Sequence, residues 1–384
     1  MKKILICLAA LVALAGCQKW TETESAFEPK EVPIGGGFDD EYYANLRLFK
    51  ATMKYRKISW AWYGGWSAVG SYNYGTMAGL PDSLDVVSLW GGWDYSGNTP
   101  NVIEAKKKDM EYVQKVKGMR IVATDLIGNF DTARINSFGW VGDLDPKGAS
   151  VSVGQHSMYS ALCTPEQESA IRKYARWVGE RVLALGYDGY DIDYEIGWGS
   201  RGTLVEYQDR MRIYVDEISK MMGPKSGTDK LFVIDGAICN LPTPEMARCF
   251  DWLVIQSYRC GSYTDLNTGG NRCSQAVNRI KTCGMSVDSI VRMLVMTEDY
   301  EGGRGGQGGV PHASEFHGSV NSLLGMALWQ PVYNGVRYER SGGCGAYHVE
   351  YEYAAKRTDG KFPGWYPWMR EAIQAMNPAN VKNK

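Results

Sequence analysis

The sequence has almost no net charge and few histidines. Its 384 residues carry 42 Lys and Arg against 43 Asp and Glu, which gives a formal charge of −1. A chain so close to neutral, with no cluster of basic residues, has no electrostatic basis for binding nucleic acid. The 4 histidines, at positions 156, 312, 317 and 348, are dispersed and form no local metal-ligand pattern.

Cysteines are present but do not follow a zinc or disulfide pattern. None of the 9 cysteines has Cys-x-x-Cys spacing. Setting aside Cys7 and Cys17, which belong to the N-terminal segment described next, 9 − 2 leaves 7, an odd number. A complete disulfide framework is therefore not indicated. Cys260 and Cys273 could pair across a Gly- and Asn-rich loop, and most of the others are expected to be small buried apolar residues.

The N-terminal apolar run is too short to span a bilayer. Met1-Lys2-Lys3 precedes apolar residues 4–15, and Leu14-Ala15-Gly16-Cys17 resembles the lipobox of bacterial lipoprotein signals. This resemblance implies cleavage before Cys17 and acylation of that residue, with a lipid-anchored location in the bacterial outer membrane or at the cell surface. The alternative is an ordinary secretory signal with an incidental cysteine. Residues 18–37 read as a flexible tether.

Aromatic residues are abundant and biased toward rings with a polar group. There are 13 Trp and 24 Tyr against 9 Phe. Such rings suit water-filled clefts and stacking on sugars, although a large core would also use them.

The most informative segment is residues 187–195, Tyr-Asp-Gly-Tyr-Asp-Ile-Asp-Tyr-Glu. Side chains alternate on a strand, so Asp191, Asp193 and Glu195 are expected on one side. Three carboxylates on one face repel each other and gain nothing from burial, but the repulsion can hold a proton on one acid while a neighbour stays ionised. An acidic edge strand or a calcium site is the alternative. Edge strands usually carry Lys or isolated charges, and a calcium loop needs turn geometry rather than an aromatic and β-branched strand.

Short apolar strands alternate with helices along residues 38–384, which predicts one α/β domain with a covered parallel sheet. The expected helices cover residues 39–52, 106–116, 165–185, 207–222, 273–282, 313–328 and 368–376, and residues 128–162 are expected to be irregular. The expected strands cover residues 58–63, 85–90, 119–126, 187–195, 231–235, 252–258, 291–297 and 345–351. Eight such units fit a (β/α)8 TIM barrel, with a doubly wound sheet as the alternative, although no Gly-x-Gly-x-x-Gly follows the first strand. Barrel sites lie at the carboxyl ends of strands, where Glu195 is expected as the last residue of its strand.

The acidic segment Asp188-Gly189-Tyr190-Asp191-Ile192-Asp193-Tyr194-Glu195 resembles the Asp-Gly-x-Asp-x-Asp-x-Glu signature of family 18 glycoside hydrolases. That family carries the signature on the fourth strand of a TIM barrel, which is its place here in strand order. The family includes chitinases and endo-β-N-acetylglucosaminidases that act on N-glycans.

Three shorter matches favour the endoglycosidase branch. Gln256-Ser257-Tyr258 resembles its Gln-x-Tyr rather than the chitinase Met-x-Tyr-Asp, and Leu126-Ile127-Gly128-Asn129 resembles its Leu-Gly-Asn. Residues 345–350, which include Tyr347, resemble its final strand loosely. Trp329 could instead be the tryptophan that closes the floor of a chitinase site, which keeps that alternative open.

The resemblance implies substrate-assisted hydrolysis with retention, an exception to the two-carboxylate scheme. Glu195 would protonate the leaving oxygen while the substrate's 2-acetamido oxygen attacks the anomeric carbon. Asp193 would orient the acetamido N–H, and Asp191 would share a proton with Asp193. Tyr258, with Gln256, would hold the acetamido carbonyl. The mechanism needs no metal and no organic cofactor.

The expected function is therefore an endo-β-N-acetylglucosaminidase that cleaves the GlcNAc-GlcNAc core of N-glycans. The alternatives are a chitinase and a non-catalytic surface glycan-binding lipoprotein on the same fold. Expected partners are a GlcNAc-containing glycan or glycoprotein and, through the lipid, a membrane, and the default oligomeric state is a monomer. Candidate substrate-binding residues are Gln256, Asn129, Trp62, Trp198 and Tyr347. Three further tryptophans follow strand ends, where a sugar-stacking platform would lie: Trp66, Trp90 and Trp93.

Overall fold

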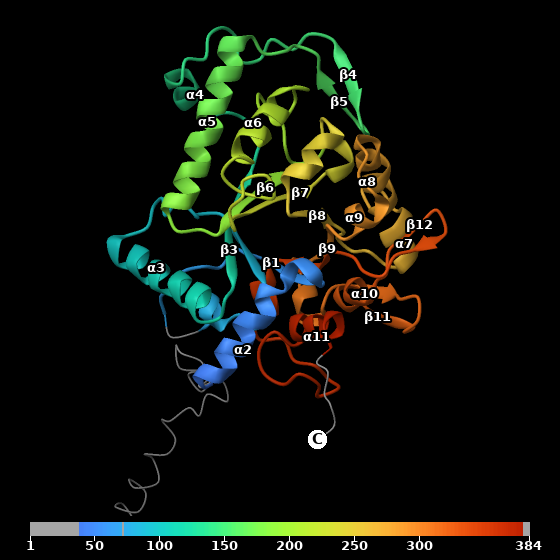
Figure 1. The fold of residues 1–384 in the computed structure, drawn as a ribbon. Coiled ribbons are helices and arrows are strands. Elements are labelled where there is room, and N and C mark those ends of the chain that lie inside the picture. The colour runs from blue at the N-terminus through green and yellow to red at the C-terminus, as the bar shows by residue number, and fades with distance from the viewer. Residues whose placement is uncertain (1–37, 71–72, 379–384) are drawn as a thin grey trace, which may run out of the picture.

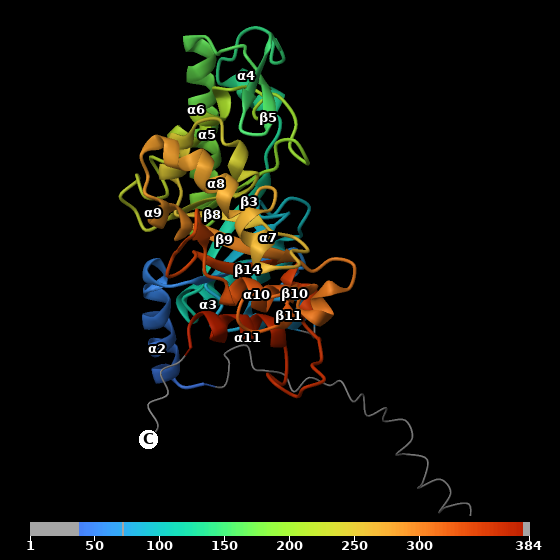
Figure 2. The ribbon, with the colours of Figure 1, turned by 90° about the vertical axis from the view of Figure 1, so that its right-hand side faces the viewer.

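Eight parallel strands form a closed barrel. The computed structural model describes residues 38–70 and 73–378, so the expected signal, tether and Cys17 lie outside the described residues. Around the barrel the strands follow the order β1-β14-β9-β8-β7-β6-β3-β2. This confirms the (β/α)8 prediction (Figures 1 and 2). The barrel strands are β1 (Ile58–Tyr63), β2 (Val86–Trp90), β3 (Arg120–Leu126), β6 (Gly189–Tyr194), β7 (Leu231–Gly236), β8 (Trp252–Gln256), β9 (Leu294–Asp299) and β14 (Gly343–Tyr347).

Helices surround the barrel unevenly. Figure 1 shows α3 and α5 on one side of the strands and α8 and α9 on the other. The described residues between β1 and β2, and those between β7 and β8, form only 3-10 turns instead of an α-helix. The helices are α2 (Asp40–Ala51), α3 (Pro100–Lys115), α4 (Thr132–Ser137), α5 (Pro165–Ala184), α6 (Arg210–Ile218), α7 (Tyr263–Thr268), α8 (Cys273–Ile280), α9 (Val287–Val291), α10 (Ser322–Leu328) and α11 (Pro367–Met376).

The barrel interior is filled by large aromatic and branched side chains. Trp60 and Trp62 of β1 pack with Val122 of β3, Val233 of β7 and Val254 of β8. A barrel of eight strands has just enough room for side chains, so bulky residues require small ones opposite them. Gly345 is one such residue, because an added Cβ would lie 2.2 Å from the backbone oxygen of Trp60.

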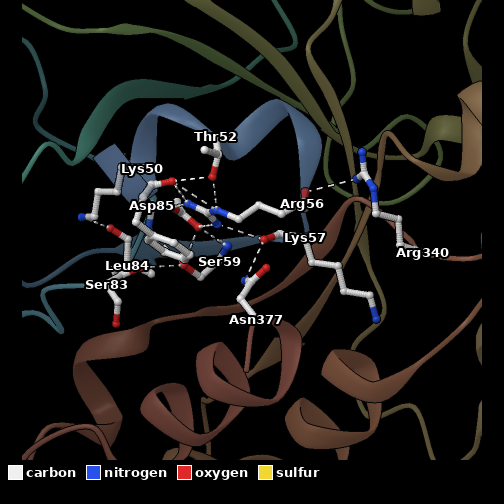
Figure 3. A network of polar contacts seen from close by, with 11 residues as sticks. Lys50, Thr52, Arg56, Lys57, Ser59, Ser83, Leu84, Asp85, Arg340 and Asn377 are labelled. Carbon is white, nitrogen blue, oxygen red and sulfur yellow. Dashed lines mark hydrogen bonds and ion pairs between the residues drawn. The ribbon is translucent and has the colours of Figure 1, made fainter. Parts of the chain in front are cut away.

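A polar network closes the end of the barrel where β1 and β2 begin (Figure 3). Arg56 donates to both carboxylate oxygens of Asp85, at 2.8 and 2.6 Å. The Ser59 amide also donates to Asp85, at 3.0 Å. Asn377, beyond α11, donates to the Lys57 carbonyl at 3.0 Å. Bidentate Arg–carboxylate pairs fix geometry well, so the network ties the first strands to the end of the described chain.

Helix α5 leads directly into the acidic strand and has a well-formed start. The Thr164 side chain accepts from the Gln167 amide, the Thr164 amide donates to the Gln167 side chain, and Pro165 follows at the first helical position. This is a capping box, which satisfies otherwise unpaired donors at a helix start. The predicted helix over 165–185 is confirmed to within one residue.

Several expected boundaries were wrong. The helix expected over 313–328 begins only at Ser322, because residues 311–321 form a hairpin, β10 (Pro311–Ala313) with β11 (Ser319–Asn321), whose turn holds Gly318 at φ +67°. The irregular segment 128–162 contains α4 and a second hairpin, β4 (Ser150–Val153) with β5 (His156–Tyr159). The last strand ends at Tyr347, and His348 then takes φ +54°.

The cysteines of the described chain are free. Cys260 and Cys273 are both buried and are not joined to each other, so the suggested pairing across the loop is wrong. Within residues 38–70 and 73–378, no helix is long and apolar enough to cross a membrane.

Candidate active site

Strand β6 divides its side chains between two environments. Tyr190, Ile192 and Tyr194 face outward into the core between the barrel and its helices. Asp191 and Asp193 face the barrel interior, where both are buried. The strand ends at Tyr194, one residue earlier than expected, so Glu195 is the first residue of the following loop.

Asp191 lies deepest and receives several hydrogen bonds on one oxygen. Its Oδ2 accepts from the Trp62 indole at 3.1 Å, from Ser88 Oγ at 2.7 Å and from Thr124 Oγ1 at 3.4 Å. Its Oδ1 is buried and has no hydrogen-bond partner. Burial raises the pKa of Asp191 to about 6, and the donors partly oppose that rise.

Asp193 lies beside a carboxylate from the next strand. The barrel register places it directly opposite Asp235 of β7. Gln256 of β8 donates to Asp235 at 2.9 Å and, more weakly, to Asp193 at 3.4 Å. Burial, followed by the nearby charges of Glu195 and Asp191, raises the pKa of Asp193 well above its usual range.

The loop 195–200 holds Glu195 at the edge of this group. The Glu195 carbonyl accepts from the amides of Trp198, Gly199 and Ser200, and its own amide donates to Ser200 Oγ at 2.9 Å. The half-buried carboxylate has no protein hydrogen-bond partner among the described residues. A Cβ added at Gly199 would lie 2.0 Å from Glu195 Oε2, so glycine is what leaves room for the carboxylate there.

Aromatic rings form the opposite wall of the same mouth. The Tyr347 ring centroid lies 6.2 Å from Trp62, 5.8 Å from Trp90 and 6.1 Å from Tyr258. Burial, together with the charges of Asp235 and Asp193, raises the pKa of Tyr258 well above its usual range. The Tyr258 phenol therefore stays protonated and can donate a hydrogen bond.

The other candidate residues occupy different places. Trp62 is 2% exposed and supports Asp191 from within the barrel, whereas Trp198 is 61% exposed on the Glu195 loop. Asn129 is exposed outside the carboxylate group and accepts from the Thr203 amide at 3.0 Å. Trp66 and Trp93 donate to buried carboxylates of Asp109 and Asp125 and are structural.

Trp329 is not a floor for the site. It follows α10, is 3% exposed and donates to Asn267 of α7 at 3.0 Å. The suggestion that it closes a chitinase-like floor is therefore wrong. A tryptophan that follows a helix lies in the outer layer of a barrel, and Trp329 belongs to the outer core.

The hairpin β4–β5 adds a wall that was not expected. At its tip, the Gln155 amide donates to Asn240 at 2.7 Å, and a Cβ added at Gly197 would lie 3.1 Å from the His156 ring. His156 thus packs against the loop that carries Glu195. Residues 150–153, Ser-Val-Ser-Val, do alternate polar and apolar side chains, and Gly154-Gln155 forms a two-residue turn with glycine first, so this hairpin signal was overlooked.

Two more residues of the site were missed as participants. Asp235 is the last residue of the expected strand 231–235 and was given no role, and Trp90 was named only as one of several tryptophans. Their positions follow from barrel register, because Asp235 pairs with Asp193 and Trp90 pairs with Thr124. A strict alignment of strand ends from the sequence could have found both. Among the described residues, no three His, Cys, Asp or Glu side chains form a group that could hold a metal ion.

Comparison with known proteins identifies the family. Residues 20–375 match Glycoside hydrolase family 18, BT1044-like. The chain belongs to glycoside hydrolase family 18. Endo-β-N-acetylglucosaminidase F2 from Elizabethkingia meningoseptica is 31% identical over 195 residues, which cover 50% of this chain and 47% of that protein. The match thus spans about half the length of that curated relative.

Solved structures share the fold of this family 18 chain. A structure of BT1044 superposes with a TM-score of 0.64 at 22% identity, covering 88% of this chain and 93% of the other. An endo-β-N-acetylglucosaminidase from Cordyceps militaris, a double variant in complex with fucosyl-N-acetylglucosamine-Asn, gives a TM-score of 0.58 at 17% identity. That match covers 89% of this chain and 97% of the other. These likenesses support the barrel architecture.

Proposed function

We propose that this family 18 protein is a retaining endo-β-N-acetylglucosaminidase that cleaves the GlcNAc-β1,4-GlcNAc core of N-glycans. The observation that carries the proposal is the convergence of Glu195, Asp193 and Tyr258 at one barrel mouth. The partial likeness to endo-β-N-acetylglucosaminidase F2 supports this substrate class.

In this mechanism Glu195 is the general acid. Its carboxyl has no competing protein hydrogen bond among the described residues, so it is free to protonate the glycosidic oxygen. The substrate's acetamido oxygen attacks the anomeric carbon as that bond breaks, which gives an oxazolinium intermediate. Glu195 then removes a proton from water, which attacks the same carbon and restores the configuration.

Asp193 and Tyr258 hold the acetamido group in attacking geometry. Asp193 accepts a hydrogen bond from the acetamido N–H and offsets the positive charge of the oxazolinium. Asp191 shares a proton with Asp193. Tyr258, whose phenol stays protonated, donates to the acetamido oxygen. Holding the internal nucleophile close removes much of the entropic cost of the reaction.

The decisive assay compares two substrates. Incubation with a glycoprotein that carries N-glycans, beside chito-oligosaccharides, is read by mass. A single GlcNAc left on Asn supports the proposal, and GlcNAc dimers released from chito-oligosaccharides indicate a chitinase instead.

Glu195→Gln should lower hydrolysis by about 10²–10⁴-fold, the contribution of a general acid, with glycan binding retained. Unchanged turnover in that variant would remove Glu195 as the acid, and binding without turnover by the wild type would indicate a glycan-binding protein.

We also propose that Cys17 is acylated and anchors the barrel in the bacterial outer membrane or at the cell surface, as a monomer. The Leu14-Ala15-Gly16-Cys17 motif supports this location. Several acyl chains at about 0.8 kcal/mol per buried CH₂ would hold the protein firmly on a bilayer.

A further inference from the structure

Asp235 is a buried carboxylate that the mechanism above does not use. It is the fifth residue of β7, is 0% exposed, and sits beside Asp193 in the barrel register. Its Oδ1 accepts from Gln256 at 2.9 Å. Its Oδ2 is buried and has no hydrogen-bond partner, and Asp191 Oδ1 is in the same condition.

The three buried carboxylates have no cation beside them. Among the described residues, the polar partners of Asp191, Asp193 and Asp235 are neutral side chains and one another, with no ion pair to Lys, Arg or His. Three ionised carboxylates in a dry site without a cation are strongly unfavourable. The group must therefore hold protons.

The donors show where the negative charge is best placed. Asp191 Oδ2 accepts from Trp62, Ser88 and Thr124, and hydrogen bonds to a carboxylate favour its ionised form. Asp235 has a single donor, Gln256, on one oxygen only. A proton on Asp235 Oδ2 would turn an unpartnered oxygen into a donor beside the Asp191–Asp193 pair.

We infer that Asp235 is a positioning residue for the proposed glycosidase reaction, a neutral acid that donates its Oδ2–H to the Asp191–Asp193 pair. This inference rests on the proposed function. The donated hydrogen bond stabilises the one negative charge that the Asp191–Asp193 pair shares, including when that charge lies on Asp193 at the acetamido N–H, although no cation is nearby. Asp235 keeps its proton throughout, so no proton is gained or lost at this position during turnover.

The ionisable groups around Asp235 agree with a neutral acid. Asp191 and Asp193 face it from β6, Glu195 faces it from the loop after β6, and Tyr258 faces it from the β8 side. Burial, followed by the charges of Asp193 and Asp191, raises the pKa of Asp235 well above its usual range. Arg272, whose side chain reaches β8, donates to the Gln256 carbonyl at 3.2 Å rather than to a carboxylate.

Two substitutions separate this role from a structural one. Asp235→Leu keeps the branched outline of aspartate, with larger methyl groups and no donor, and it should lower kcat roughly 10²-fold, the cost of one lost donor at a charged site, with a much smaller change in KM. Asp235→Asn keeps a permanently neutral donor. It should recover most of the kcat lost in the leucine variant, because its Nδ2–H replaces the donated proton.

Asp125→Asn is the matched control. Asp125 is a largely buried acid of β3 whose pKa is also raised by burial, but it accepts from Trp93 and Tyr190 on the outer side of the barrel. The Asp125→Asn variant should keep the wild-type pH–rate profile. Thermal melting checks that all variants fold.

Each outcome decides between the claims. An active wild type with unchanged kcat in Asp235→Leu, or with no recovery of kcat in Asp235→Asn, overturns the role of Asp235. An inactive wild type overturns the proposed function instead. In that case infrared spectra still test the protonation: loss of a neutral carboxylic acid band in Asp235→Asn at neutral pH supports the neutral acid, and an unchanged spectrum overturns it.

Discussion

At the residue scale, the site brings together acids whose burial lowers the stability of the fold. Asp191 is wholly buried, and its hydrogen bonds do not fully offset desolvation, so its pKa is raised to about 6. The unfolded chain would release this proton near the ordinary value of 3.8. As pH rises through this window, the unfolded state loses a proton that the folded state keeps, and stability falls.

Asp191→Asn should therefore stabilise the protein in a pH-dependent manner. The amide removes the ionisation but can still accept from Trp62 and Ser88. The melting temperature of the variant, relative to wild type, should rise as the pH is raised from 4 to 7. Circular dichroism melts at several pH values measure this.

Asp94→Asn supplies a contrast of opposite sign. Desolvation raises the pKa of Asp94, but hydrogen bonds from Ser96 and the charge of Arg181 outweigh it, and the net pKa is lowered. The ionised form stabilises the fold at higher pH, so this variant should lose stability relative to wild type as pH rises. A relative melting temperature of Asp191→Asn that does not change with pH would contradict the assigned pKa.

At the scale of elements, the loop 195–200 positions the proposed acid through its backbone. Three amides converge on the Glu195 carbonyl, and Gly199 leaves space at Oε2. The sequence indicated the acidic strand clearly, because alternation of side chains is local. The hairpin β4–β5 has a local signal in residues 150–155, but its packing on Asn240 and Gly197 depends on distant residues and could not be predicted.

Gly199→Ala should displace the Glu195 carboxylate. The new methyl group would lie 2.0 Å from Oε2, so the carboxylate would have to move. Misplacing a reacting group by about 1 Å costs about 10²-fold in rate. Steady-state kinetics on the substrate of the wild type measure the effect. Gly306→Ala is the control, because an added Cβ there has nothing within 4 Å. Equal kcat in Gly199→Ala and wild type would show that the loop adapts.

At the scale of the whole molecule, strand order and barrel class were predictable because each strand is a short apolar run with clear boundaries. All eight barrel strands were expected within a few residues of their positions. The partners of Asp193 were harder to predict, since Asp235 and Gln256 reach it only through the closed register of neighbouring strands. Trp329 was misplaced for the same reason, because its contacts with α7 are long-range.

The proposed anchor concerns the whole molecule as well. Intact mass of the full chain extracted from membranes of a bacterial host should show a protein that begins at acylated Cys17. Cys17→Ser should lack the acyl mass and lose partition into a detergent phase, because it has no thiol to be modified. Wild-type protein without acyl mass, or a serine variant that partitions equally, would contradict the anchor.

The closure of the barrel sets when this site can exist at all. Strand β1 pairs with β14, which ends at Tyr347, so the sheet becomes a ring only after the last strand has left the ribosome. Until then β1 and β9 each present an open edge to other nascent chains, a known hazard for aggregation. The acids of β6 also stay hydrated until that moment, so the unfavourable desolvation comes late in synthesis, when most of the apolar surface is available to offset it.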